Sequence, residues 1–293
     1  MRKEFETRKE FSQEEIDNWF DYAKPNEVKD GVIWINEPHH FEDVYAFLIE
    51  GSSQDLLIDT GMGINPIKPL LDNIRGDSKP LMVANTHWHF DHVGGNKEFD
   101  KVFVPFRAHE VYGIKKGWSN SELSKYFFAD GFWHGFPLNF DKDNFSILGY
   151  EKAHFLPQKI DLGNRTIQTI YTPGHTSGSV SFFDETNGLL FTGDLLYEGP
   201  LYAFEEESDP NHYLDSLITI SNLPIRRIHP GHNHSDTSGF PDLIGEAISL
   251  FERAKNKELW DSPGEFENTV EYHHPDTKLG RRLKIVVSKD FVR

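Results

Sequence analysis

Four potential metal ligands stand within six consecutive residues of this 293-residue chain: His87, His89, Asp91 and His92. Imidazole and carboxylate groups are the ligand types that suit zinc and other borderline divalent ions. In an extended backbone His87 and His89 point to the same side, and a turn after them can direct Asp91 and His92 toward a neighbouring point. The stretch therefore predicts a metal site, and it can serve two metal positions.

The setting of this cluster supports the metal interpretation. A pair of surface histidines alone would mean little, but here the cluster follows the apolar run 81–84 and precedes Gly94 and Gly95. Such a run predicts a buried strand, and the end of a rigid strand is a suitable place for a site. The alternative is that the cluster is the remnant of a former metal site whose other ligands have been lost.

Three residues in the second half of the chain are candidates for the other metal ligands and argue against such a remnant. His175, Asp194 and His232 each follow an apolar, strand-like run at a turn that contains glycine. His234 is an alternative to His232, but the sequence Pro-Gly-His favours His232. Asp59, in Asp-Thr-Gly after another apolar run, is either a plain turn residue or a carboxylate that orients a ligand or its loop.

Composition narrows the function classes. The chain has no cysteine, which excludes disulfides, thiol nucleophiles and cysteine-bound zinc. Its 47 acidic residues outnumber its 30 basic residues and give a net charge of −17, which disfavours nucleic acid as a partner. The apolar runs are too short for a membrane span, and residues 1–6 lack the apolar segment of a secretory signal. These features predict a cytoplasmic protein.

Short apolar runs alternate with turns rich in Gly, Pro and Asn, which predicts many strands and several helices. Strands are expected at 32–35, 44–49, 56–58, 81–84, 102–104, 159–162, 166–170, 180–183 and 189–191. Helices are expected after the capping box of Ser12 and Glu15, after an Asn65 cap with Pro66 as the first helical residue, and at about 108–114, 213–218 and 241–259. A terminal hairpin should pair 268–272 with 283–287, and the lack of a linker predicts a single domain over 1–293.

Residues 118–155 are unusually aromatic, at about twice the chain average of 14%. The aromatic residues of this segment are Trp118, Tyr126, Phe127, Phe128, Phe132, Trp133, Phe136, Phe140, Phe145, Tyr150 and Phe155. One interpretation is an insertion that packs against the core or against the second subunit of a homodimer. The other is a lid whose aromatic face binds an apolar group.

The seven candidate ligands, in this order and in these turns, resemble the signature of the metallo-β-lactamase superfamily over residues 30 to 235. The resemblance implies an α/β fold, an αββα sandwich of two mixed β-sheets with helices on the outer faces and the site at one edge between the sheets. It also implies two divalent metal ions per chain, with zinc expected and manganese or iron as alternatives. His87, His89 and His175 would hold one ion. Asp91, His92 and His232 would hold the other, with Asp194 as a bridge.

Differences between this chain and some branches of the family narrow the range of reactions to expect. The flavodiiron branch has glutamate where this chain has His89, and the family's nucleases carry basic surfaces. Tyr197 follows Asp194 by three residues, as in the family's N-acyl homoserine lactonases, and by that resemblance it would stabilise an oxyanion or donate a proton. An ordinary tyrosine at a strand end is the alternative. The runs 194–199 and 31–35 are also similar to relatives associated with acyl-coenzyme A thioester hydrolysis.

We therefore expect a dinuclear metallohydrolase that cleaves the carbonyl of an ester or thioester, a lactone or an acyl-coenzyme A thioester, with an apolar acyl group. Its metal-bound hydroxide would attack the carbonyl, and Asp91, Asp194 and Tyr197 are the candidate catalytic residues. Two rival functions remain. One is a mononuclear iron persulfide dioxygenase that uses His87, His175 and Asp194. The other is a non-catalytic interaction protein that binds metal.

Overall fold

The chain forms two compact units in the computed structural model, which describes residues 12–76, 79–128, 133, 135–233, 242–256, 261–264, 266–273 and 283–291. Unit 1 comprises residues 1–104 and 111–154, and unit 2 comprises 105–110 and 155–293. Residues 105–110 therefore belong to unit 2, although the segments on both sides of them belong to unit 1. The single domain expected from the sequence stays a prediction.

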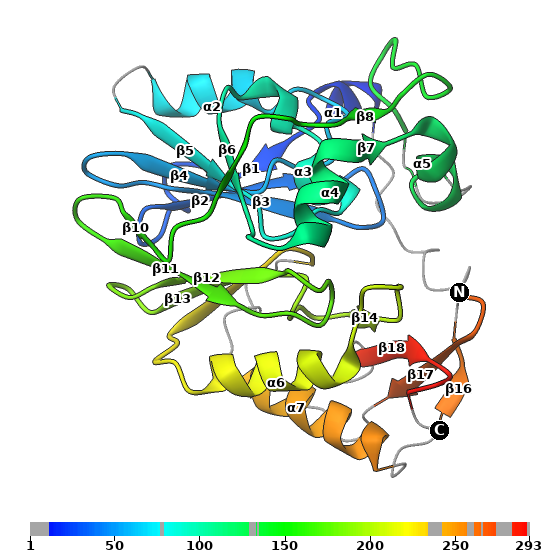
Figure 1. Cartoon of the computed structure of the whole chain (residues 1–293). Coiled ribbons are helices and arrows are strands. Elements are labelled where there is room, and N and C mark those ends of the chain that lie inside the picture. Colours follow the sequence, from blue (N-terminus) through cyan, green and yellow to red (C-terminus); the bar gives the residue numbers. More distant parts are fainter. Residues whose placement is uncertain are drawn as a thin grey trace. The chain divides into compact units, whose positions relative to one another are not determined.

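Unit 1 is built on a seven-stranded mixed sheet in the order β1-β2-β3-β4-β5-β6-β9 (Figure 1). Its strands are β1 (Asp21–Tyr22), β2 (Val32–Glu37), β3 (Val44–Ile49), β4 (Asp55–Ile58), β5 (Leu81–Ala84), β6 (Val102–Val104) and β9 (Ala153–Phe155). The first four strands form an antiparallel meander, whereas β4, β5 and β6 run parallel. Because β4 and β5 are parallel neighbours, the residues that follow them meet at one edge of the sheet.

The helices of unit 1 lie before β1 or in the connections between the strands. They are α1 (Gln13–Asp17), α2 (Lys68–Arg75), α3 (Phe90–Val93), the 3-10 turn η1 (Asn96–Glu98), α4 (Ala108–Lys116), which begins in unit 2, and α5 (Asn120–Tyr126). Both α1 and α5 begin with a complete capping box, at Ser12 and Ser119. The box predicted at Ser12 is confirmed.

The predicted start of α2 is wrong. Asn65-Pro66 does not cap this helix, which begins at Lys68 after Ile67 and has no cap from a neighbouring side chain. Instead Glu98 accepts hydrogen bonds from the Ile67 and Lys68 backbone N–H groups, at 3.1 and 2.9 Å. A carboxylate from a distant turn satisfies the free N–H groups of the first turn, and local sequence does not encode that contact.

The aromatic segment contributes much of the core of unit 1. Phe127 and Tyr150 are buried, and Trp118, Phe128 and Trp133 pack against the same core. The strands β7 (Gly117–Trp118) and β8 (Ile147–Leu148) pair with each other in antiparallel fashion. Packing against the core is therefore shown for these five residues, whereas Phe155 is exposed. The lid and the homodimer stay predictions. Phe132 and the Tyr126 side chain lie outside the description.

Unit 2 contains a five-stranded mixed sheet in the order β10-β11-β12-β13-β15. Its strands are β10 (Lys159–Asp161), β11 (Thr166–Tyr171), β12 (Val180–Asp184), β13 (Leu189–Gly193) and β15 (Arg227–Pro230). Neighbours are antiparallel from β10 to β13, but β13 and β15 are parallel. The residues after β13 and after β15 therefore meet at one edge.

A second sheet of unit 2 has the order β14-β18-β17-β16. It consists of β14 (Pro200–Ala203), β16 (Asp261–Pro263), β17 (Thr269–His273) and β18 (Lys284–Ser288). The antiparallel pairing of β17 with β18 confirms the predicted terminal hairpin. The parallel pairing of β14 with β18 was not predicted, because it joins segments far apart in the sequence.

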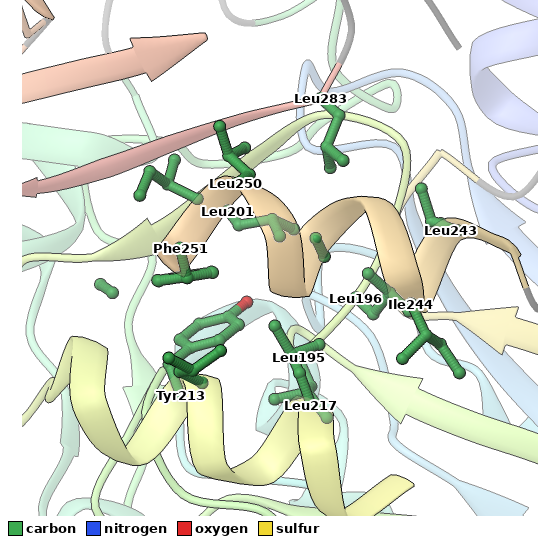
Figure 2. Packing of buried hydrophobic residues seen from close by; sticks show 14 of the residues in the cluster. Leu195, Leu196, Leu201, Tyr213, Leu217, Leu243, Ile244, Leu250, Phe251 and Leu283 are labelled. Atoms are coloured by element: carbon green, nitrogen blue, oxygen red, sulfur yellow. The ribbon is translucent and has the colours of Figure 1, made fainter. Parts of the chain in front are cut away.

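Helices α6 (Pro210–Ser221) and α7 (Asp242–Lys255) pack together over the core of unit 2. Figure 2 shows Tyr213 of α6 facing Phe251 of α7, and the centroids of these two stacked rings are 4.8 Å apart. The Tyr213 hydroxyl donates to the backbone carbonyl of Asp194 at 2.7 Å. A core residue of this unit therefore holds the backbone of the candidate ligand Asp194.

The predicted α/β class, with mixed sheets and helices, is confirmed by both units. None of the helices in the described part of the chain is long and apolar enough to cross a membrane.

Candidate metal centre

The four ligands of unit 1 follow β5 directly. Strand β5 ends at Ala84, the backbone is still extended at His89, and α3 begins at the next residue, so Asp91 and His92 lie on its first turn. The ring centroids of His87 and His89 are 4.6 Å apart, and those of His87 and His92 are 4.2 Å apart. The predicted cluster therefore gathers in one place. His89 is half-buried and the other three side chains are buried.

Asp59 holds this cluster from the end of the neighbouring strand β4. Its carboxylate accepts hydrogen bonds from the backbone N–H of Thr86 at 2.8 Å, from the Thr86 hydroxyl at 2.9 Å and from Nδ1 of His92 at 2.8 Å. Of the two interpretations of Asp59, the geometry supports the carboxylate that orients a ligand. Such outer partners fix the tautomer and the ring orientation of a metal-bound histidine.

The hydrogen bonds determine which ring nitrogens carry protons. Asp59 only accepts, so Nδ1 of His92 is the protonated nitrogen and its Nε2 keeps a lone pair. The Thr86 hydroxyl donates to Asp59 and therefore accepts from Nδ1 of His87, 3.0 Å away. Nε2 of His92 lies 3.7 Å from Oδ2 of Asp91. Two electron-pair donors that face each other are the arrangement expected of ligands of one cation.

A buried amide network fixes the end of α3. The side chains of Asn85 and Asn96 hydrogen-bond to each other at 2.9 and 3.2 Å, and Thr60 donates to Asn96 at 3.0 Å. Asn85 and the Thr60 backbone N–H both donate to the carbonyl of His92, at 3.1 and 2.9 Å. The backbone that carries the ligands is therefore preorganised.

The three ligands of unit 2 meet at the edge where β13 and β15 end. Nε2 of His175 lies 3.3 Å from Oδ2 of Asp194, and Nε2 of His232 lies 3.0 Å from Oδ1 of the same carboxylate. Nδ1 of His175 donates to the Tyr202 carbonyl at 3.0 Å, so its Nε2 lone pair faces Asp194. The Gly231 N–H donates to the Gly193 carbonyl at 3.0 Å and ties the two strand ends together.

Both sets fit divalent cations. In unit 1 the ligand atoms of His87 and His89 lie within 4.8 Å of each other, as do those of Asp91 and His92, and in unit 2 those of His175 and Asp194 do so too. Imidazole nitrogens with assigned lone pairs and carboxylate oxygens are the donors that zinc, iron and manganese accept. Each unit therefore holds a group of His and Asp side chains that can bind a divalent metal.

Tyr197 lies beside this second set. Its ring meets that of His232 edge-on with centroids 5.2 Å apart, and it is buried. Its hydroxyl donates to the carbonyl of Pro200, three residues along the chain. The proposed role of Tyr197 as a donor to substrate is not tested by this geometry and stays a prediction.

Other histidines have structural settings. His229 stacks on Phe191 at 4.9 Å, and His40 is buried with its Nε2 3.2 Å from the Phe127 carbonyl. His39 is buried beside Trp19, with ring centroids 5.1 Å apart. His134 and His234 lie outside the described residues.

Sequence reasoning missed Glu37, a buried carboxylate at the end of β2. It accepts hydrogen bonds from Nε1 of Trp19 at 2.5 Å and from the Met62 backbone N–H at 2.7 Å. Burial raises its pKa to about 7, with a smaller contribution from the charge of Asp91, while the two hydrogen bonds act in the opposite direction. No motif marked this residue, because a glutamate at a strand end is ordinary in sequence.

Comparisons with known proteins agree with this picture. The family model described as the metallo-beta-lactamase superfamily matches residues 41–232. The human acyl-coenzyme A thioesterase MBLAC2 is 28% identical over 221 residues, which cover 69% of this chain and 78% of that protein. A hydroxyacylglutathione hydrolase from Trichodesmium erythraeum is 28% identical over 203 residues, 66% of this chain and 65% of that protein.

A solved structure shows the same fold. The metallo-beta-lactamase from Pontibacter korlensis matches with a TM-score of 0.57 and 17% identity, over 80% of this chain and 99% of that one. The predicted resemblance and fold are thereby confirmed. The family match spans all seven candidate ligands, and the chain belongs to the metallo-beta-lactamase superfamily, of which it is a hydrolase.

Proposed function

We propose that the protein is a dinuclear metal-dependent hydrolase of an ester or thioester carbonyl, with an acyl-coenzyme A-like thioester or a lactone as substrate. The observation that carries this proposal is the position of Asp194. Its carboxylate lies within 3.3 Å of Nε2 of His175 and within 3.1 Å of Nε2 of His232. A carboxylate shared by two histidines is the position that a bridging ligand requires.

We assign His87, His89 and His175 to one ion and Asp91, His92 and His232 to the other, with Asp194 as the bridge. The ions, with zinc expected and manganese or iron as alternatives, would supply an activated water and polarise the substrate carbonyl. Asp91 and Asp194, buried carboxylates of the two sets, would hold and transfer the proton during turnover.

The substrate assignment has support from the named relatives. The human relative is named as an acyl-coenzyme A thioesterase and the relative from Trichodesmium erythraeum as a hydroxyacylglutathione hydrolase. Both names describe hydrolysis of a carbonyl joined to a leaving group. We therefore favour a small-molecule substrate with an apolar acyl group over a nucleic acid, in agreement with the net charge of −17.

Tyr197 is our candidate donor to the developing oxyanion. To act in this way its hydroxyl would have to turn from the Pro200 carbonyl toward the substrate, while its contact with His232 keeps the ring in place. Tyr197→Phe should lower kcat by about tenfold or more. An unchanged kcat would make Tyr197 an ordinary structural residue.

The deciding experiment is metal analysis of the native protein by mass spectrometry, joined to activity on lactones, acyl-coenzyme A thioesters and phosphodiesters. We expect about two ions per chain and cleavage of an ester or thioester. One iron per chain with oxygen uptake would indicate a persulfide dioxygenase instead. Metal without turnover would indicate an interaction protein, and cleavage of phosphodiesters alone would overturn the carbonyl assignment.

The cytoplasmic location and the homodimer are further parts of the proposal. Fractionation of cells and the mass of the protein in solution would test them separately from the activity.

A further inference from the structure

We infer that Glu110 is a positioning residue for His175, acting through Thr176. The inference rests on the proposed function in one respect, because it takes His175 to be a metal ligand. Glu110 belongs to the six-residue segment 105–110, which is part of unit 2 although the chain on either side of it belongs to unit 1. Within unit 2 this segment contacts the loop that carries His175, through the hydrogen bond between Glu110 and Thr176.

Glu110 is fully buried, and its Oε1 accepts a hydrogen bond from the Thr176 hydroxyl at 2.5 Å. The hydroxyls of Thr176 and Ser179 are 2.7 Å apart, and the Thr176 backbone N–H donates to the Ser179 hydroxyl at 3.2 Å. Since the proton of the Thr176 hydroxyl goes to Glu110, the Ser179 hydroxyl is the donor between them. All three groups take consistent roles in one chain.

Close packing leaves this loop little freedom. A Cβ at Gly178 would lie 2.3 Å from Cγ of Glu110, and a Cβ at Gly174 would lie 2.3 Å from Cα of Tyr213. The loop is thus enclosed between the 105–110 segment and α6. Only backbones without a side chain at these two positions can approach so closely.

His175 is fixed on its other sides as well. Its backbone carbonyl accepts from the Ser208 hydroxyl at 2.6 Å, and its Nδ1 donates to the Tyr202 carbonyl at 3.0 Å. Thr176 is the next residue in the chain, so its anchor to Glu110 sets the remaining direction of the His175 backbone. The anchor should therefore determine how well Nε2 is placed for a metal.

The test is metal affinity, measured on metal-free protein by Co²⁺ titration with visible absorption and by Zn²⁺ competition with a chromophoric chelator. Thr176→Val keeps the volume of the side chain and removes the hydroxyl that donates a hydrogen bond to Glu110. It should weaken metal binding by about 10- to 100-fold, as loss of an outer partner typically does. Glu110→Ala should do the same, and Thr176→Ser, which keeps the hydroxyl, should restore the wild-type affinity.

Thr269→Val is the matched control. Thr269 is also buried in unit 2, and its hydroxyl donates to a backbone carbonyl, that of Phe266, at 2.7 Å. It should lower the melting temperature of the metal-free protein and leave metal affinity unchanged. Ser179→Ala is a milder change in the same chain of hydroxyls, and it serves if Thr176→Val does not fold.

The outcomes separate this inference from the proposed function. Wild-type affinity in Thr176→Val or, where that variant does not fold, in Ser179→Ala would overturn the positioning role, as would an equal loss in Thr269→Val. A wild-type protein that binds neither ion would instead overturn the proposed metal centre.

Discussion

At the scale of single residues, a few carboxylates decide how the ligands are presented. Asp59 receives three donors on two oxygens, from the Thr86 backbone, the Thr86 hydroxyl and the His92 ring. An amide in its place would offer only one accepting oxygen and would direct N–H groups at one of these donors. The orientation of His92 should therefore depend on this carboxylate.

Asp59→Asn should weaken metal binding by about 10- to 100-fold. Zn²⁺ competition on metal-free protein measures this. Asp55→Asn is the control, because Asp55 begins β4, the strand that Asp59 follows, and is equally buried, but it pairs with Arg75 and Lys79 at 3.0 and 2.9 Å. That variant should lose stability and keep its metal affinity, and equal losses of affinity would show that Asp59 has no specific role.

Glu37 predicts a dependence of stability on pH. Its pKa in the folded protein, about 7, lies above the ordinary value of 4.5, so the folded state binds its proton more tightly than the unfolded state. The resulting stabilisation is fully present below pH 4.5 and is lost as the pH rises through 7. For a shift of this size the loss amounts to about 3 kcal/mol.

Urea unfolding of metal-free protein between about pH 4 and 8 would measure this loss, with Glu37→Gln as the comparison. The glutamine cannot titrate, so the unfolding free energy of the wild type should fall relative to the variant across that range. Parallel curves for the two proteins would show that Glu37 keeps an ordinary pKa.

The ligands could be predicted from the sequence, but the residues that hold them could not. His87 to His92 stand together because the chemistry needs them close, and the pattern is visible in one short stretch. Glu37 and Glu110 act on backbone or side chains 25 and 66 residues away. Only the fold creates such pairs, and a single buried glutamate has no signature in sequence.

At the scale of elements, helix α4 makes room for an aromatic side chain between two ligands. A Cβ at Gly113 would lie 2.3 Å from the ring of Trp88, the residue between His87 and His89. The Trp88 ring cannot yield freely, because it stacks on Trp118 at 4.7 Å with an interplanar angle of 9°. The aromatic segment thus supports the ligand stretch within unit 1.

Two glycine-to-alanine changes in helices should therefore have opposite effects. Gly113→Ala should cost about 1–3 kcal/mol through overpacking against Trp88. Gly245→Ala in α7 should add about 0.5–1 kcal/mol, since a Cβ there meets nothing within 4 Å and alanine favours a helix. Thermal or urea unfolding of both variants would measure this, and a stabilised Gly113→Ala would contradict the close packing.

Element boundaries followed from the sequence where the signal was local. The capping box at Ser12, the strands around the ligand turns and the pairing of β17 with β18 were all predicted. The start of α2 was not predicted, because the distant Glu98 caps that helix. The strand β14 was not predicted, because it pairs with the distant strand β18. Contacts between distant segments override local propensity at such places.

At the scale of the whole molecule, each unit presents an incomplete set of ligands. Unit 1 holds His87, His89, Asp91 and His92, and unit 2 holds His175, Asp194 and His232. Neither set alone gives two dications the number of protein donors that such centres use. The proposed function therefore requires more ligands than either set supplies alone.

Metal content of single and double variants would test this requirement. If His87 and His175 bind the same ion, His87→Ala and His175→Ala should each lose that ion, and the double variant should lose no more than either single variant. Independent binding by the two sets would instead make the losses additive. His212→Ala, which removes an exposed histidine of α6, should keep the wild-type content. Additive losses with a normal control would mean that His87 and His175 bind separate ions, and the proposed ligand assignment would then have to be abandoned.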